Sequence, residues 1–196
     1  MRLLMNSLVL GTVLMSACST TSSLQPVEYL DDRTALTVGS LKEPIELVPP
    51  LGQGGLQAAF GSLSKKVSFA YLGPVEWDRS GTIVYGLWVH LAPANNRPIA
   101  DIRSPAALTL ILDGGARVLK PMDAPQLGRG PYQAVASWGQ TAYFELTVDM
   151  LKQMAASEKL ALNVRATDDS IVNFTATGDT REMLTAYLRS RDITAD

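Results

Sequence analysis

The chain has 196 residues, the size of one domain and enough to bury an apolar core. Its 17 basic and 19 acidic side chains give a formal net charge of -2, which argues against nucleic-acid binding and against a polybasic membrane surface. One cysteine, Cys18, and one histidine, His90, exclude an internal disulfide and a zinc site, which needs three or four nitrogen or sulfur ligands.

Residues 1–17 have the pattern of a secretory signal peptide. Arg2 supplies the positive n-region, residues 8–15 the apolar h-region, and Ser16-Ala17 the small residues before a cleavage site. The apolar stretch is shorter than the roughly 20 residues of a membrane span. Residues 18–26 (CSTTSSLQP) then predict a flexible tether, because serine and threonine dominate them.

Met15-Ser16-Ala17-Cys18 resembles the bacterial lipobox, in which an apolar residue (most often leucine, here methionine) and two small ones precede an obligatory cysteine. The resemblance implies that the Cys18 thiol takes a diacylglyceryl group, that the peptide is cut before it, and that the new amino terminus is acylated, for example with palmitate. Ser19 in the next position implies the outer membrane, because aspartate is the usual inner-membrane retention signal. The alternative is an ordinary signal peptide cut near Ala17, which leaves a lone thiol in an oxidising compartment.

The first half of the mature chain consists of short strand-like segments divided by turn-forming residues. Residues 27–48 hold three short extended pieces, and residues 49–55 (PPLGQGG) form a loop on composition. Clear alternation follows in residues 66–72 (KVSFAYL) and 81–91 (GTIVYGLWVHL). The second of these is apolar on both faces, which predicts a strand in the middle of a sheet. We expect Gly73-Pro74 to end the first.

The second half predicts more strands and two helices. In residues 106–120 a hairpin is expected, because Asp113-Gly114-Gly115 supplies the positive φ angles of a tight turn. The later segments are, in order, a strand at 141–147, a helix at 148–157, strands at 159–166 and 171–177, and a helix from 179. Thr147 is the expected cap of the first helix, and residues 179–182 form a capping box for the second.

Seven or eight short strands with turn chemistry between them predict a mainly β (α+β) fold. We expect an antiparallel β-sandwich or curled sheet, with two short helices near the C-terminus. Residues 27–196 are then one periplasmic domain, which we expect to be monomeric. Three stretches, YLGPVEWDRSGTIVYGLWVHL, AYFELTVDMLKQMA and GDTREMLTAYL, are similar to a group of uncharacterised proteobacterial lipoproteins. That resemblance implies a location in the cell envelope and does not indicate an activity.

Catalytic and cofactor motifs are missing from the sequence. No Gly-x-Ser-x-Gly presents a serine to His90, and GQGGLQ (residues 52–57) departs from Gly-x-Gly-x-x-Gly and follows prolines instead of a strand, so no cofactor is expected. Asp31-Asp32 and Asp168-Asp169 have the pattern of solvated turns. Adjacent residues of an extended chain also point to opposite faces.

Trp88 and His90 are the candidates for a binding face. Alternation places both on one side of the strand at residues 81–91, together with Val84 and Gly86, where they can form a binding floor. The same side can instead pack beneath a helix, with the imidazole hydrogen-bonded to a backbone group. We favour packing, because an exposed face would not need apolar residues on both sides of the strand.

By exclusion, we expect a non-enzymatic binding or scaffolding module at the periplasmic side of the outer membrane, attached through the lipid on Cys18. Its partner would be an envelope protein before a glycan. The alternative is a small cell-envelope hydrolase that acts on glycan with a carboxylate pair assembled only by folding.

Overall fold

The computed structural model describes residues 25–49, 68–94 and 98–193. Cys18, the expected tether up to residue 24 and the GQGGLQ segment lie outside the described residues. Among the described residues, no helix is long and apolar enough to cross a membrane.

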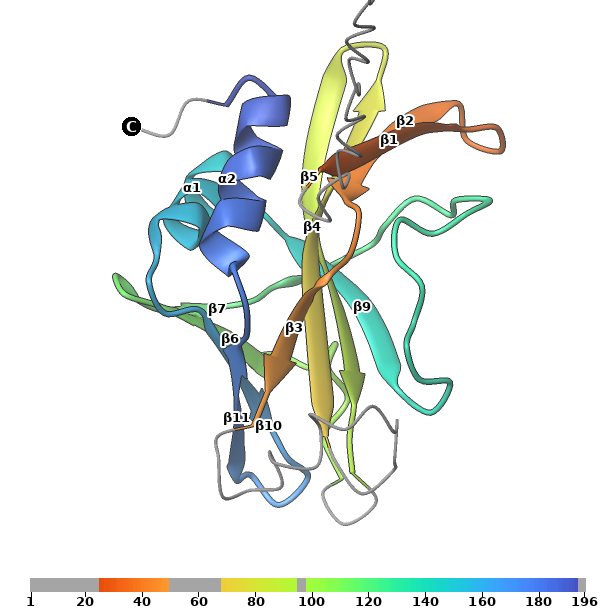
Figure 1. The fold of residues 1–196 in the computed structure, drawn as a ribbon. Helices are drawn as coiled ribbons and strands as arrows, with labels where there is room; N and C mark the ends of the chain where they lie inside the picture. The colour runs from red at the N-terminus through yellow and green to blue at the C-terminus, as the bar shows by residue number, and fades with distance from the viewer. Residues whose placement is uncertain (1–24, 50–67, 95–97, 194–196) are drawn as a thin grey trace, which may run out of the picture.

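The described chain forms one 11-stranded antiparallel sheet and two short helices (Figure 1). The strands are β1 (Pro26–Asp31), β2 (Leu36–Leu41), β3 (Ile45–Val48), β4 (Phe69–Arg79), β5 (Thr82–Ala92), β6 (Leu108–Leu112), β7 (Gly115–Val118), β8 (Pro121–Met122), β9 (Gln140–Glu145), β10 (Ala161–Arg165) and β11 (Ile171–Ala176). The helices are α1 (Val148–Ala156) and α2 (Thr180–Ser190). The mainly β fold with a curled antiparallel sheet is confirmed, with more strands than expected.

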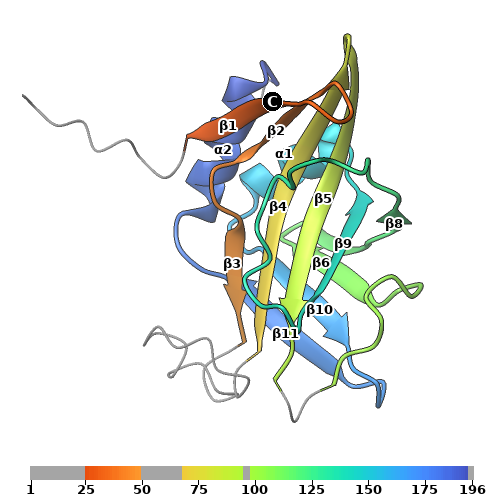
Figure 2. The same cartoon turned by 90° about the vertical axis from the view of Figure 1, so that its right-hand side faces the viewer.

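The strand order is β7-β6-β10-β11-β3-β4-β5-β9-β8, and the β1-β2 hairpin joins β4 beside this path. The sheet curls into a half barrel, as Figures 1 and 2 show. The helices α1 and α2 pack against each other and cover the concave side. The apolar face of each helix packs into the core on this side through the buried residues Leu151, Met154, Leu184, Tyr187 and Leu188.

The expected break at Gly73-Pro74 is wrong, because β4 runs through both residues to Arg79. On one edge β4 changes neighbour at this point: β3 pairs with it up to Leu72 and β2 from Val75 onward. The Tyr132 hydroxyl fills the gap by accepting the N–H of Leu41 and donating to the carbonyl of Pro74. Another residue at position 74 would direct its backbone N–H into this same gap, where no strand lies opposite. Proline has no such N–H, so β4 loses no strand-to-strand hydrogen bond by containing it.

The side of the sheet away from the helices is crossed by residues 123–139, which we call the strap (Figure 2). Paired residues of antiparallel strands share a face, so Tyr71, Gly73 and Trp77 of β4 lie on the same side as Trp88 and His90 of β5. Tyr132 of the strap inserts over Gly73, where a Cβ atom would overlap the tyrosine ring. The sheet is therefore covered on both sides at its centre, which explains the apolar residues on both faces of β5.

Candidate functional site

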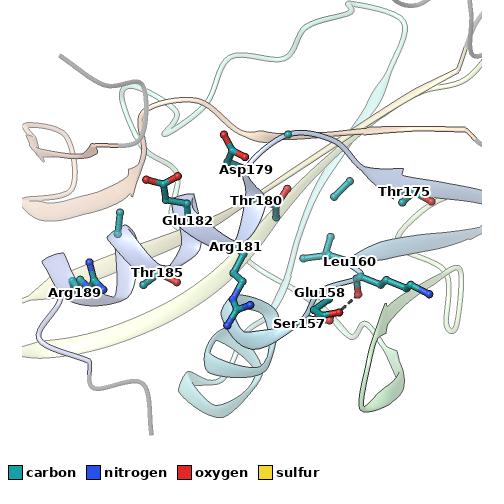
Figure 3. A pocket seen from close by; sticks show the side chains of 14 residues that line it. Ser157, Glu158, Leu160, Thr175, Asp179, Thr180, Arg181, Glu182, Thr185 and Arg189 are labelled. Carbon is teal, nitrogen blue, oxygen red and sulfur yellow. Dashed lines mark hydrogen bonds between the residues drawn. The ribbon is translucent and has the colours of Figure 1, made fainter. Parts of the chain in front are cut away.

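The candidate site is a groove around the last turn of α1. Three adjoining hollows of about 770, 540 and 330 Å³ share wall residues there. Arg181 and Thr185 line the first two hollows, Gln153 and Ala156 the second and third, and Ser157 the first and third. We call these hollows together the α1–α2 groove; Figure 3 shows the largest of them.

The groove side of α2 follows from its apolar spacing. Leu184, Tyr187 and Leu188 recur at three- and four-residue intervals and are buried. Thr185 and Arg189 each follow one of the two buried leucines and line the groove. The predicted start of α2 at Asp179 is right, but the capping box is not formed as expected, because the Asp179 side chain makes no capping hydrogen bond.

Asp113 fixes the opposite wall. This residue opens the β6–β7 turn, and its carboxylate accepts the N–H groups of Glu158 and Lys159 just after α1. Ser157 completes the link, because its hydroxyl accepts the Asp113 N–H at 3.0 Å and donates to the Lys159 carbonyl at 2.7 Å. The pKa of Asp113 is lowered, and the hydrogen bond from the Glu158 N–H is the largest cause. Burial would raise this pKa, but the other hydrogen bonds to the carboxylate outweigh burial. The end of α1 is thus held to the β6–β7 hairpin.

The walls of the largest hollow carry charges of both signs. The basic residues Lys159, Arg181 and Arg189 line it together with the acidic residues Glu158, Asp179 and Glu182. Arg181 points toward α1 in Figure 3, while Asp179 lies on the other side of α2. No aromatic residue is present among the described residues that line the three hollows. Among the described residues, no cluster of histidine, cysteine, aspartate and glutamate is arranged to hold a metal ion.

Trp88 and His90 lie in the interior, with 2 % and 0 % of their surface exposed. Their rings stack with centroids 5.8 Å apart, and the centroid of the Tyr132 ring lies 5.0 Å from that of Trp88. His90 Nδ1 is 2.8 Å from the Thr141 hydroxyl, and Nε2 accepts the Ala136 N–H at 3.3 Å. Burial lowers the pKa of His90. This geometry favours packing over a binding floor, although the cover is the strap and not a helix.

The expectation that Asp31-Asp32 is a solvated turn is wrong for Asp31, which is 3 % exposed. Its carboxylate accepts hydrogen bonds from Thr34 in its own turn and from the N–H groups of Gly128 and Arg129 in the strap. The strap is distant in sequence, so the local pattern carried no signal of this role. The expectation holds for Asp168-Asp169, both exposed in the β10–β11 turn.

Sequence reasoning missed one ionic cluster. Arg191, just after α2, pairs with Glu28 of β1 and lies 3.5 Å from Glu76 of β4. Its guanidinium lies over Gly39 of β2, where a Cβ atom would overlap it. Three residues far apart in the chain meet here, and none belongs to a recognisable local pattern.

No protein-family model matches this chain, and no curated protein or solved structure is significantly similar to it.

Proposed function

We propose that this protein is an outer-membrane lipoprotein, anchored through Cys18 on the periplasmic side, whose domain binds or scaffolds another envelope protein without catalysing a reaction. The lipobox-like sequence before Cys18 supports the anchor. The α1–α2 groove supports the binding role and supplies its site.

The observation that carries the proposal is the continuity of the groove. Hollows that share walls around the end of α1 accommodate an extended segment better than a compact small molecule. Charges of both signs suit the mixed polar side chains of a peptide. The described residues of the lining offer no aromatic face on which a sugar ring could stack, which favours a protein partner over a glycan.

The test is site-specific photo-crosslinking in intact cells. A photoreactive amino acid is placed in the full chain at Thr185 or Gln153 in the groove, and as a control at Thr82, which is exposed at the start of β5. We expect one discrete adduct at both groove positions and none at Thr82. Arg181→Glu should abolish that adduct, since Arg181 lines two of the hollows. The same pattern at all three positions, or no adduct in the groove, would contradict the proposal.

The glycan-hydrolase alternative has one observation in its favour: Glu158, Asp179 and Glu182 line the same hollow. It requires that the purified protein release soluble fragments from cell-wall glycan, and that Glu182→Gln remove this activity without unfolding the domain. Two carboxyl groups would then act as acid and as base or nucleophile.

A further inference from the structure

The strap is held to the sheet at three places that differ in chemistry. At residues 128–129 its N–H groups bond to the Asp31 carboxylate, at distances of 2.7 and 3.2 Å. In the middle, the Tyr132 hydroxyl bonds to β2 and β4. Beyond Tyr132, the Ala136 N–H bonds to His90, and Gly139 lies so close to the imidazole that a Cβ atom there would overlap it. We call residues 133–139 the distal strap.

The hydrogen bonds of His90 define its proton position. Nε2 accepts an N–H from Ala136, so Nε2 itself carries no proton. The proton of the neutral ring is therefore on Nδ1 and is donated to the Thr141 hydroxyl. A second proton would have to bind at Nε2, where it would face the N–H of Ala136. Two donors cannot share a hydrogen bond, so protonation is incompatible with the closed distal strap.

The groups around His90 do not relieve this conflict. Among the described residues, the ionisable groups near the ring are Tyr71 of β4, whose ring centroid is 6.5 Å away, and Tyr132 of the strap, which packs on Trp88. Burial, then Glu46, raises the pKa of Tyr71 to about 12, and burial raises that of Tyr132, so both stay neutral in acid. Burial is the influence that lowers the pKa of His90. Thr141 of β9 is not ionisable.

The other two attachments withstand acid. Burial opposes ionisation of Asp31, but its hydrogen bonds with Thr34, Arg129 and Gly128 outweigh burial and lower its pKa from the ordinary value of an aspartate. The carboxylate therefore stays charged at a pH where a histidine takes a proton. The tyrosine attachment does not depend on pH in this range.

We infer that the distal strap is a pH-sensitive closure: protonation of His90 releases residues 133–139 from the sheet, while Asp31 and Tyr132 keep the rest of the strap in place. Release uncovers His90 and the small apolar cluster of Phe69, Ala92 and Ala136, while Tyr132 stays on Trp88. The closed form excludes the proton and the open form accepts it, so acid favours opening. The equilibrium shifts by up to about tenfold per pH unit below roughly pH 6.5, until the pKa of the closed form is reached.

The experiment uses the full chain, isolated through a tag that contains no histidine. His90 is the single histidine in the sequence, so with ¹⁵N-histidine labelling both ring nitrogen signals, Nδ1 and Nε2, come from this residue. We expect the Nδ1–H tautomer near pH 7. Hydrogen exchange, corrected for the intrinsic pH dependence of the exchange rate, should show protection of residues 133–139 falling below about pH 6.5 by up to tenfold per pH unit. Protection at residues 128–129 should stay constant over the same range.

His90→Gln is the matched variant, because its amide oxygen can accept the Ala136 N–H but takes no proton. Its distal strap should keep constant protection where that of the wild type falls. The comparison of the two strap segments in the wild type needs no variant and decides the question if His90→Gln does not fold. The inference is overturned by an Nε2–H tautomer, by parallel loss of protection in both segments, or by an unchanged acid response in folded His90→Gln.

Discussion

The Tyr132 side chain makes the hydrogen bonds that the backbone of a neighbouring strand would otherwise make. Where β4 changes its neighbour from β3 to β2, the Leu41 N–H and the Pro74 carbonyl have no strand opposite them. The buried hydroxyl bonds to both, at 3.0 and 2.8 Å. An unmatched buried N–H or carbonyl costs about 1–3 kcal/mol, so this contact matters more than an ordinary surface hydrogen bond.

Tyr132→Phe should therefore lower the free energy of unfolding by about 2–6 kcal/mol, because two backbone groups stay buried without a partner, at about 1–3 kcal/mol each. Urea denaturation monitored by tryptophan fluorescence measures this. Tyr29→Phe is the control: Tyr29 also donates to a backbone carbonyl, that of Arg129, but near the surface, and should cost less than about 1 kcal/mol. Equal losses in the two variants would show that the Tyr132 hydroxyl does not support the gap.

The sequence could not reveal this role. Glycine and proline at 73–74 are a strong local signal for a turn, and the expectation of a break followed from local chemistry alone. The continuity of β4 depends on a tyrosine from the strap and on two strands, β3 and β2, that pair one after the other with the same edge of β4. By contrast, the burial of Trp88 and His90 was foreseeable, because the apolar alternation on both faces of β5 is itself local.

At the scale of elements, Arg191 joins the C-terminal end of α2 to the N-terminal hairpin. It lies between Glu28 on β1 and Glu76 on β4 and stacks on Tyr187 at 5.6 Å. Burial alone would lower the pKa of Arg191, but Glu28 and the buried Glu76 raise it, so the guanidinium stays charged. Glu76 is 6 % exposed, and its second carboxylate oxygen has no hydrogen-bond partner among the described residues. Arg191 is thus the cation that makes the burial of Glu76 tolerable.

Arg191→Met should lower the free energy of unfolding by about 3–5 kcal/mol, because it leaves a carboxylate buried without its cation. The double variant Arg191→Met with Glu76→Gln should recover a large part of the loss, since the remaining group is then neutral. Arg189→Met, which changes an exposed arginine near the same helix end, should stay within about 0.5 kcal/mol of the wild type. Chemical denaturation of the four proteins tests this, and a loss in Arg191→Met no greater than in Arg189→Met would refute it.

The helices themselves were the most predictable elements. The expected helix at 148–157 is present at Val148–Ala156, and Thr147 caps it by accepting the Met150 N–H at 3.1 Å. In α2 the helical spacing of Leu184, Tyr187 and Leu188 can likewise be read from the sequence, and these residues face the core. The α1–α2 groove was not predictable, because its walls arise where two helices and the β6–β7 hairpin meet through Asp113. Periodicity gives the face of each helix but not the neighbour it will have.

For the molecule as a whole, the proposed location at the outer membrane depends on the first residues of the chain. A formal net charge of -2 gives the chain no general attraction to anionic lipid. Acyl chains would supply the attachment instead, since each buried CH₂ contributes roughly 0.8 kcal/mol and several chains make release negligible. The domain begins its first strand at Pro26, eight residues after Cys18, a stretch that reaches about 26 Å when extended at ~3.3 Å per residue.

Cys18→Ala should remove the acylation site and leave the protein uncleaved or soluble in the periplasm, because no other feature of the sequence predicts membrane attachment. Fractionation of cells into inner membrane, outer membrane and periplasm, followed by detection of this chain, measures the outcome. Ser19→Asp is the matched control: it keeps the lipid but introduces the usual retention signal, so the protein should move to the inner membrane. If Cys18→Ala still separated with the outer membrane, a protein contact would be holding the domain there and the lipid anchor would be the wrong explanation. The groove would then be the first place to look for that contact, and Arg181→Glu in the Cys18→Ala background should release the protein.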